Sequence, residues 1–293
     1  MPTISFLILT YNSSSYIKRL LDSIFSVLHS EIERGEVEII VEDNASHDNT
    51  VKVVEEYKKS KKNIVLYVSK ENKGYASGIN NAARKAGGKL LVVVNPDSEL
   101  VSFNFKEIVG EFENNKKLAV AGLKIVDFEG NNEKTAGTFF NPLSFLAFSL
   151  GFEKHLGLRY SPKEKTPVDF TSGGFVVFRK DAFEKLGGYD EDYFMYVEDM
   201  DICYRAKKAG FLVCFLPYGV LRHKGQGSSS REFAIVNIYK GLQTFHTKHG
   251  SFLMTFYVKN LLTFKAALII FIGAILGKKE LVATYTKALH TIV

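Results

Sequence analysis

Three carboxylates, Glu198, Asp199 and Asp201, lie in the stretch YFMYVEDMDICYRA (residues 193–206), which is otherwise mostly apolar and aromatic. Charges in such a setting cost free energy unless a cation pairs with them or a reaction uses them. Asp201 and Arg205 are four residues apart, so on a helix they can pair on one face, which favours a structural role for Asp201. A simpler alternative is that all three acids occupy the first turn of a helix, where the helix dipole favours negative charge.

The elements that must position such residues can be read from hydrophobic periodicity. Apolar runs typical of buried strands cover residues 4–9, 37–41, 63–68 and 90–94, and they alternate with helical patterns over residues 15–28, about 49–59 and about 75–85. This alternation predicts an α/β fold with a mostly parallel, Rossmann-like sheet flanked by helices. After residue 100 the pattern loosens, and residues 138–166 read as aromatic and irregular.

The four predicted strands all end in polar segments, namely TYN (10–12), EDNASHDNT (42–50), SKENKGYASGIN (69–80) and NPDSE (95–99). Parallel sheets bind ligands at the carboxyl ends of their strands, so these segments are candidate ligand-binding loops. Alternatively, loops are polar in any case, and Asn and Asp residues such as Asp48 cap the helices that follow.

The distribution of charge separates a neutral body from a basic tail. Seven lysines and one acid give residues 233–293 a net charge of +6, which equals the net charge of the whole 293-residue chain. This pattern lacks the Arg-rich stripe of a nucleic-acid binder and fits contact with an anionic membrane surface. Cys203 and Cys214 are expected to be buried, reduced thiols, and the N-terminus has no signal-peptide pattern, so we expect the chain to fold in the cytoplasm.

Six motifs, in this order, resemble those of the family-two glycosyltransferases of GT-A fold, in particular the rhamnosyltransferase-like branch: ISFLILTYN, VEDNASHDNT, NKGYASGIN, NPDSE, TSGGFVVFRK and YFMYVEDMDICYRAKKAG. Each motif is weak alone, but the ordered set is specific, and it covers about residues 3–227. The resemblance implies a catalytic domain over residues 1–230, with a nucleotide-sugar-binding half over about 1–100 and an acceptor half over 101–230. It implies inverting transfer from a nucleotide-diphospho-sugar, assisted by Mg²⁺ or Mn²⁺.

The same resemblance implies which residues contact the donor. Asp43 would accept a hydrogen bond from the pyrimidine ring nitrogen. The other expected donor contacts are Thr10, Tyr11, Asn12, Asn44, Lys73, Gly74, Asn80, Asn95 and Gly174. The family's metal motif, D-x-D, here reads Asn95-Pro96-Asp97, which leaves Asp97 as the expected direct ligand. A cation held there would neutralise charge on the departing diphosphate.

The resemblance also implies roles for the acids of the opening stretch. Asp199 would be the general base that takes the proton of the acceptor hydroxyl, and such help is typically worth on the order of 10²–10⁴ in rate. Glu198 would orient the loop or bind acceptor hydroxyls. His223 is expected as a nitrogen ligand of the metal or as a donor to the diphosphate, although a lone histidine is often structural.

The apolar tail leaves three possibilities open. The longest uncharged run, residues 266–277, is well short of the ~20 residues that span a bilayer. We therefore expect a helical segment over residues 231–293 that contacts the inner face of the cell membrane through residues 250–293. A helix packed on the body or on a second copy of the chain, and a true span over residues 260–277, are the alternatives. The acceptor is then a saccharide or a lipid-linked saccharide of cell-surface polysaccharide synthesis, and the donor is of dTDP-rhamnose or UDP-hexose type.

The sequence supports other classes of function less well. The departure at Asn95 keeps open a catalytically inactive nucleotide-sugar-binding partner subunit, but the presence of Asp97, Glu198, Asp199 and His223 argues against it. Nucleotidyltransferases and dinucleotide-binding oxidoreductases carry a Gly-rich loop after the first strand, whereas this chain has TYNSSS there.

Overall fold

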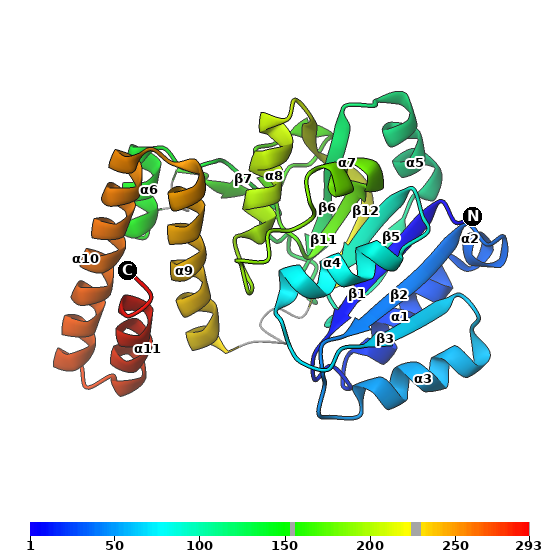
Figure 1. The fold of residues 1–293 in the computed structure, drawn as a ribbon, viewed down its shortest axis with the longest axis horizontal. Coiled ribbons are helices and arrows are strands. Elements are labelled where there is room, and N and C mark those ends of the chain that lie inside the picture. Colours follow the sequence, from blue (N-terminus) through cyan, green and yellow to red (C-terminus); the bar gives the residue numbers. More distant parts are fainter. Residues whose placement is uncertain (153–155, 224–229, 293) are drawn as a thin grey trace.

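A nine-stranded sheet with helices on both faces forms the body of the protein; the computed structural model describes residues 1–152, 156–223 and 230–292 (Figure 1). The strand order is β3-β2-β1-β4-β11-β6-β12-β5, with β9 paired to β12. These strands are β1 (Ile4–Thr10), β2 (Val37–Asp43), β3 (Ile64–Val68), β4 (Leu90–Val94), β5 (Ser98–Phe103), β6 (Leu118–Val126), β9 (Thr166–Pro167), β11 (Phe175–Arg179) and β12 (Leu212–His223). A small second sheet, of order β10-β7-β8, joins β7 (Ala136–Gly137), β8 (Arg159–Tyr160) and β10 (Phe170–Thr171).

The two halves of the large sheet differ in strand direction. Strands β1 to β4 pair in parallel, as the alternation of strand and helix patterns predicts. In the second half, β6 and β12 continue in that direction, while β5, β9 and β11 run against it. The carboxyl ends of β1, β2, β3 and β4 therefore share one edge, and the loops that follow them lie together.

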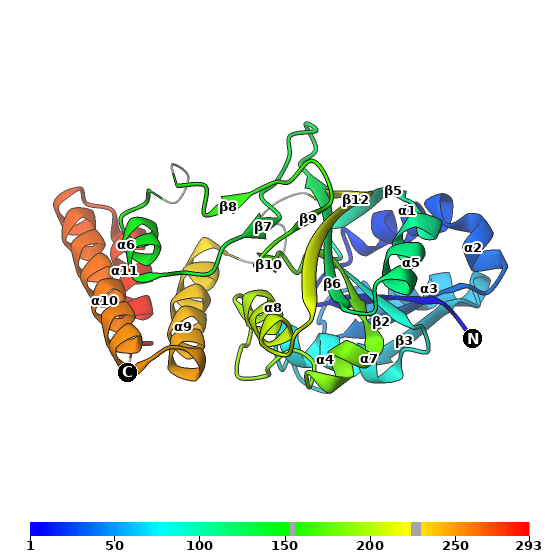
Figure 2. The ribbon, with the colours of Figure 1, turned by 90° about the horizontal axis from the view of Figure 1, so that it is seen from above.

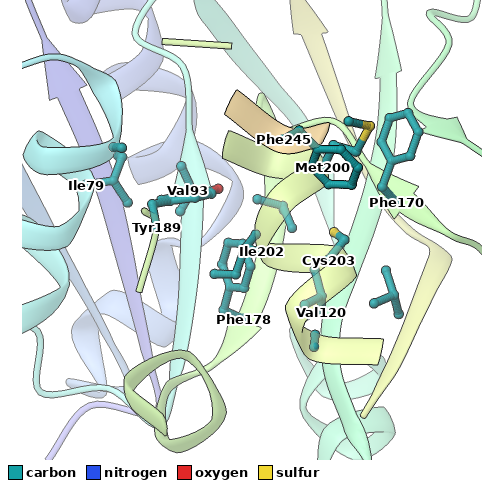
Figure 3. Close-up of a cluster of buried hydrophobic side chains, with 14 of the residues drawn as sticks. Ile79, Val93, Val120, Phe170, Phe178, Tyr189, Met200, Ile202, Cys203 and Phe245 are labelled. Carbon is teal, nitrogen blue, oxygen red and sulfur yellow. The ribbon is translucent and has the colours of Figure 1, made fainter. Parts of the chain in front are cut away.

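Two hydrophobic cores lie on opposite faces of the sheet because successive side chains of a strand point to opposite sides. Phe6 and Ile8 pack with the helices α1 (Ile17–Val27), α2 (His29–Glu33), α3 (Thr50–Ser60) and α5 (Phe105–Asn114). Leu7 and Leu9 face the other core, which includes α4 (Tyr75–Lys85), α7 (Lys180–Lys185) and α8 (Glu198–Lys208). Figure 3 shows the second core, with Ile202 and Cys203 of α8 directed at the sheet. Both cysteines are buried and free, as expected.

The C-terminal helices α9 (Arg231–His249), α10 (Phe252–Ile275) and α11 (Lys279–Leu289) group with α6 (Pro142–Ser149) at the end of the molecule opposite β3 (Figures 1 and 2). Leu242 and Phe245 of α9 belong to the same core as Phe170 and Met200 of the body. Helix α9 is therefore packed on the core of the preceding residues.

Helix α10 has two contrasting faces. Val258, Leu262, Ala266 and Gly273 are buried, and the helix contacts α9, α11 and α6. A set of large apolar side chains on α10 is exposed, comprising Phe252, Leu253, Phe256, Phe264, Leu268, Phe271, Ile272 and Ile275. Among the helices of the described residues, only α10 is long and apolar enough to cross a membrane.

Candidate active site

The segment that leads into α8 has an unusual backbone. Tyr196 and Val197 both have φ of 71°, a conformation that costs a side-chain-bearing residue about 1–3 kcal/mol. The neighbouring helix α9 crosses this turn at Gly241, where a Cβ atom would lie 2.8 Å from Cγ2 of Val197. The turn places Glu198 and Asp199 in the first turn of α8. The helix-start interpretation is thus correct for their position, but their surroundings are those of a cavity rather than of bulk solvent.

Asp199 lines a cavity of about 360 Å³, the Asp199 cavity. The cavity also includes Arg159, Gly173 and Glu198, and its remaining wall is largely apolar, with Phe140, Phe148, Leu158, Phe170, Ile238 and Leu242. The backbone N–H of Gly173 donates to Oδ2 of Asp199 at 3.1 Å, which fixes the direction of the carboxylate. Burial raises the pKa of Asp199, while the charge of Arg159 and backbone N–H groups oppose that rise.

Glu198 is 5% exposed, and its Oε2 atom has no hydrogen-bond partner among the residues that the structure describes. Burial, and then the charge of Asp199, raise the pKa of Glu198 well above its ordinary value. The adjacent acids therefore differ in environment: Glu198 is held towards its neutral form, whereas Asp199 retains a cation and N–H donors that favour its charge. This difference suits Asp199 to accept a proton.

Asp201 has the structural role expected of it. Its side chain is fully buried and accepts from Nε of Arg205 at 2.7 Å. Nε2 of His249, on α9, lies 2.6 Å from the other carboxylate oxygen, which also accepts from the Tyr193 hydroxyl at 3.3 Å. Asp201 therefore ties α8 to α9.

A second cavity, of about 410 Å³, lies at the ends of the parallel strands and is named here the Asn44 cavity. Its lining includes four residues expected to contact the donor, Tyr11, Asn44, Gly74 and Asn95, together with Asn72 and Phe194. Tyr75 and Asn95 line both cavities. The Tyr75 hydroxyl donates to the carbonyl of Gly173 at 3.2 Å and lies 3.4 Å from Oδ1 of Asn95. The two cavities thus meet at this pair of side chains and at Met195, which also lines both.

The other residues expected along the nucleotide form a network around Asp43. Its Oδ1 atom accepts from the hydroxyls of Thr10 at 2.8 Å and Ser46 at 2.6 Å, and Oδ2 accepts from Ser46 N at 2.9 Å. Asn12 Oδ1 accepts from the N–H of His47 at 2.9 Å. Asp43 is fully buried, so a base contact would have to share oxygens that already hold this loop in place.

Three other residues expected to contact the donor lie outside both the Asp43 network and the lining of the Asn44 cavity. Asn80 is engaged elsewhere, because its amide bonds both the N–H and the carbonyl of Tyr189. Lys73 is exposed and lies 3.2 Å from Glu71, outside the lining of either cavity. Gly174 does line the Asp199 cavity, where a Cβ atom would lie 3.3 Å from Nδ2 of Asn95.

Asp97 and His223 lie together beside these cavities. Nε2 of His223 lies 3.3 Å from Oδ1 of Asp97, and its Nδ1 lies 3.3 Å from Oε1 of Glu133. The contact to Asp97 has the distance of an ion pair but not the alignment of a hydrogen bond, so within the described part of the chain this buried oxygen is unsatisfied. Burial lowers the pKa of His223, but Asp97 and Glu133 raise it to about 10.

This pair fits a divalent cation only in part. No cluster of three or more His, Cys, Asp or Glu side chains in the described residues could hold a metal by itself. Oδ1 of Asp97 supplies one ligand, and the imidazole supplies a second once it releases the proton that Asp97 and Glu133 stabilise on it. Oxygens of a diphosphate and water would complete the shell. Asp97 lines a separate depression with Tyr16 and Arg19. Its charge nevertheless reaches the Tyr75 hydroxyl, whose pKa is raised by burial and by Glu198, Asp199 and Asp97.

Sequence reasoning missed several residues that shape the site. Tyr75 stands within the motif NKGYASGIN but had no assigned role, and Arg159 falls in the segment that read as irregular. Ile238 and Leu242 come from α9, beyond the last motif. Their helical spacing was visible, but only the packing of α9 shows that it faces the cavity.

Comparison with known proteins agrees with this architecture. The family model described as Glycosyl transferase family 2 matches residues 5–187, and one described as the N-terminal domain of galactosyltransferase matches residues 155–225. A curated relative, the N-acetylglucosaminyl-diphospho-decaprenol L-rhamnosyltransferase of Mycobacterium tuberculosis, is 26% identical over 252 residues, covering 76% of each chain. Rhamnosyltransferase WbbL of Escherichia coli K12 is 26% identical over 221 residues, covering 72% of this chain and 79% of that one.

Solved structures share the fold at low sequence identity. A Pyrobaculum calidifontis mannosyltransferase, in complex with GDP-Man and Mn²⁺, has a TM-score of 0.58 at 16% identity and covers 99% of this chain and 86% of its own. GalNAc-T7, with UDP, GalNAc and Mn²⁺, has a TM-score of 0.61 at 18% identity, covering 83% of this chain. The present chain spans about half of that protein, 48% of its length. The expected GT-A arrangement is thus confirmed, and the chain belongs to glycosyltransferase family 2.

Proposed function

We propose that this glycosyltransferase moves a rhamnosyl or hexosyl group, with inversion, from a nucleotide-diphospho-sugar to a saccharide or lipid-linked saccharide of cell-surface polysaccharide synthesis. The observation that carries the proposal is the meeting of the Asp199 and Asn44 cavities at Tyr75 and Asn95. A donor in the Asn44 cavity would present its sugar to an acceptor hydroxyl beside Asp199. The relatives support this assignment, since two of them are named as rhamnosyltransferases, one of them for an N-acetylglucosaminyl-diphospho-decaprenol.

The chemistry assigns a separate task to each acid. Asp199 accepts the proton of the acceptor hydroxyl as its oxygen attacks the anomeric carbon, and the nucleoside diphosphate leaves from the opposite face of the sugar. Glu198, held towards its neutral form, can donate a hydrogen bond to an acceptor oxygen without repelling the charge on Asp199. The apolar wall of the Asp199 cavity excludes water, which would otherwise compete as the acceptor.

Asp97 and His223 would hold a divalent cation, which supplies positive charge for the departing diphosphate. The Mn²⁺ in two solved neighbours supports this assignment. The residues of this chain contribute the unsatisfied oxygen of Asp97 and a histidine that Glu133 orients from its other ring nitrogen.

A panel of nucleotide sugars tests the function. With Mn²⁺ or Mg²⁺ and candidate acceptors, the wild-type protein should release nucleoside diphosphate from at least one donor. Asp199→Asn should bind that donor normally and turn over about 100-fold more slowly or worse. Asp181→Asn, which alters an exposed acid at the start of α7, is the matched control and should behave as wild type. Wild-type turnover in Asp199→Asn would move the base elsewhere, and nucleotide-sugar binding without turnover by the wild type would favour the inactive partner subunit.

We also propose that the protein lies on the inner face of the cell membrane through the exposed apolar face of α10. That face has flanking lysines at Lys278 and Lys279, and one face buried against other helices suits a helix that lies in the interface better than one that spans it. Phe264→Glu should reduce flotation with anionic liposomes, whereas Val68→Glu, at an exposed apolar position on β3, should not. Equal flotation of both variants would remove this claim.

A further inference from the structure

The charges that line the Asp199 cavity are unevenly placed. Asp199 and Glu198 are acidic, and Arg159, on β8, is the one cation lining the cavity among the described residues. Its guanidinium donates to the carbonyl of Lys134 at 3.1 Å and lies 5.8 Å from the centre of the Phe170 ring. Among the residues the structure describes, Arg159 has no carboxylate at ion-pair distance, so its charge is available to a ligand. Arginine's planar fork matches phosphate oxygens in two-point contacts.

The wall next to Arg159 is apolar and aromatic. Phe140, Phe148 and Leu158 line the cavity on the side of α6 and β8. These side chains offer no polar partner to a sugar hydroxyl, but they suit an isoprenoid chain. A cavity that combines a carboxylate, a guanidinium and such a wall matches a ligand with a sugar, an anion and a hydrocarbon in sequence.

The apolar wall continues to the surface of the protein. Phe148 belongs to α6, and Nζ of Lys265, on α10, lies 4.9 Å from the centre of its ring and donates to its carbonyl at 3.4 Å. The Tyr257 hydroxyl of α10 donates to the carbonyl of Pro142 at 3.0 Å, which fixes α6 against α10. Leu143 and Leu150, on and just after α6, are 73% and 51% exposed, and α6 itself contacts α10. Helix α6 thus carries both a side chain of the cavity wall, Phe148, and exposed apolar surface at Leu143, along which a hydrocarbon leaving the cavity would continue.

We propose that Arg159 binds the diphosphate of a polyprenyl-diphosphate-linked saccharide acceptor, with the acceptor sugar at Asp199 and the first isoprene units against Phe140, Phe148 and Leu158. This inference rests on the proposed function and specifies the acceptor class of the same site. The donor's diphosphate is the competing source of the same anion. It would lie in the Asn44 cavity, on the other side of Tyr75 and Asn95, whose lining does not include Arg159.

Binding measurements on the full chain separate these sources. The probes are farnesyl diphosphate, farnesol, inorganic diphosphate and dTDP or UDP, measured in EDTA so that no divalent cation can hold a diphosphate. The wild type should bind farnesyl diphosphate at least about 10-fold tighter than farnesol or inorganic diphosphate. Arg159→Gln should weaken farnesyl diphosphate binding about 10- to 100-fold, and leave farnesol and nucleotide binding unchanged. Arg159→Lys keeps the positive charge but loses the two-point geometry of the guanidinium. Its affinity for farnesyl diphosphate should therefore lie between those of the wild type and Arg159→Gln.

Lys163→Gln is the matched control, because it removes an exposed cation four residues away that does not line the cavity. Equal affinity of wild type and Arg159→Gln for farnesyl diphosphate would overturn the proposal. An equal loss of nucleotide binding would assign Arg159 to the donor instead, and inorganic diphosphate bound as tightly as farnesyl diphosphate would remove the lipid from the site. Failure of the proposed function is distinguishable, because it appears as absence of turnover with every nucleotide sugar and does not depend on Arg159.

Discussion

Gly241 offers a sharp test of how α9 supports the catalytic turn. A Cβ atom added there would lie 2.8 Å from Cγ2 of Val197 and 3.0 Å from the carbonyl oxygen of Tyr196. Both of these residues already have φ of 71°, and they stand directly before the acids of α8. The substitution Gly241→Ala therefore pushes a methyl group against the turn that orients Asp199.

The expected magnitude follows from two opposing effects. Replacing glycine by alanine inside an exposed helix stabilises it by about 1 kcal/mol. Forcing a methyl group into a filled space typically costs about 1–3 kcal/mol, so the net effect of Gly241→Ala lies between no change and about 2 kcal/mol of lost stability. If the turn moves to relieve the contact, a displacement of Asp199 approaching 1 Å lowers kcat on the order of 10- to 100-fold.

The matched control is Gly110→Ala on α5, where nothing lies within 4 Å of the added methyl group. Urea unfolding should show this variant more stable than wild type by about 0.5–1 kcal/mol, with unchanged kcat. Gly241→Ala should show no such gain, and its kcat should fall while the donor KM stays within a few-fold. A Gly241→Ala protein that gains as much stability as Gly110→Ala and keeps full kcat would refute the idea that α9 supports the turn.

Three further predictions concern the acids of the site. The acid limb of kcat should lie above the pKa of about 4 of an ordinary aspartate, since burial raises the pKa of Asp199 and only the deprotonated form is a base. Arg159→Gln should move that limb to still higher pH, because the charge of Arg159 lowers the pKa of Asp199. A limb that does not move would show that the charge of Arg159 does not act on Asp199. Asp97→Ala should weaken Mn²⁺-dependent donor binding, measured by titrating the donor with and without EDTA, and should leave metal-free nucleotide binding unchanged; an equal loss in EDTA would contradict the ligand role. Asp201→Asn should lower the free energy of unfolding by about 3–5 kcal/mol in urea, since Arg205 loses its buried counter-charge; a loss below about 1 kcal/mol would show that the pair contributes little.

The first half of the fold could be predicted from the sequence because its signals are local. Strands β1 to β4 are continuous apolar runs separated by helices of clear periodicity, so both their existence and their parallel pairing follow. The same holds for the pair Asp201–Arg205, which needs only helical spacing. Residues 138–166 gave no such signal, because α6, β8 and β9 are short and owe their structure to partners far along the chain.

The site itself was predictable by residue type more than by geometry. Asn44 and Asp199 each line one of the two cavities that meet at Asn95. Spacing alone, however, could not show that the side-chain amide of Asn80 is hydrogen-bonded to Tyr189. Nor could it show that Asp43 is already bonded to Thr10. In each case a second polar group, distant in sequence, takes the hydrogen bond, and only tertiary structure shows which partner prevails.

The course of α9 bears on which reaction a shortened chain would perform. Phe233 lines the Asn44 cavity, and Ile238 and Leu242, further along the same helix, line the Asp199 cavity. A fragment ending at residue 230 would keep Asp97 and Asp199 but lose this shared hydrophobic side. Bulk water would then reach the anomeric carbon, and hydrolysis of the activated sugar would compete with glycoside formation.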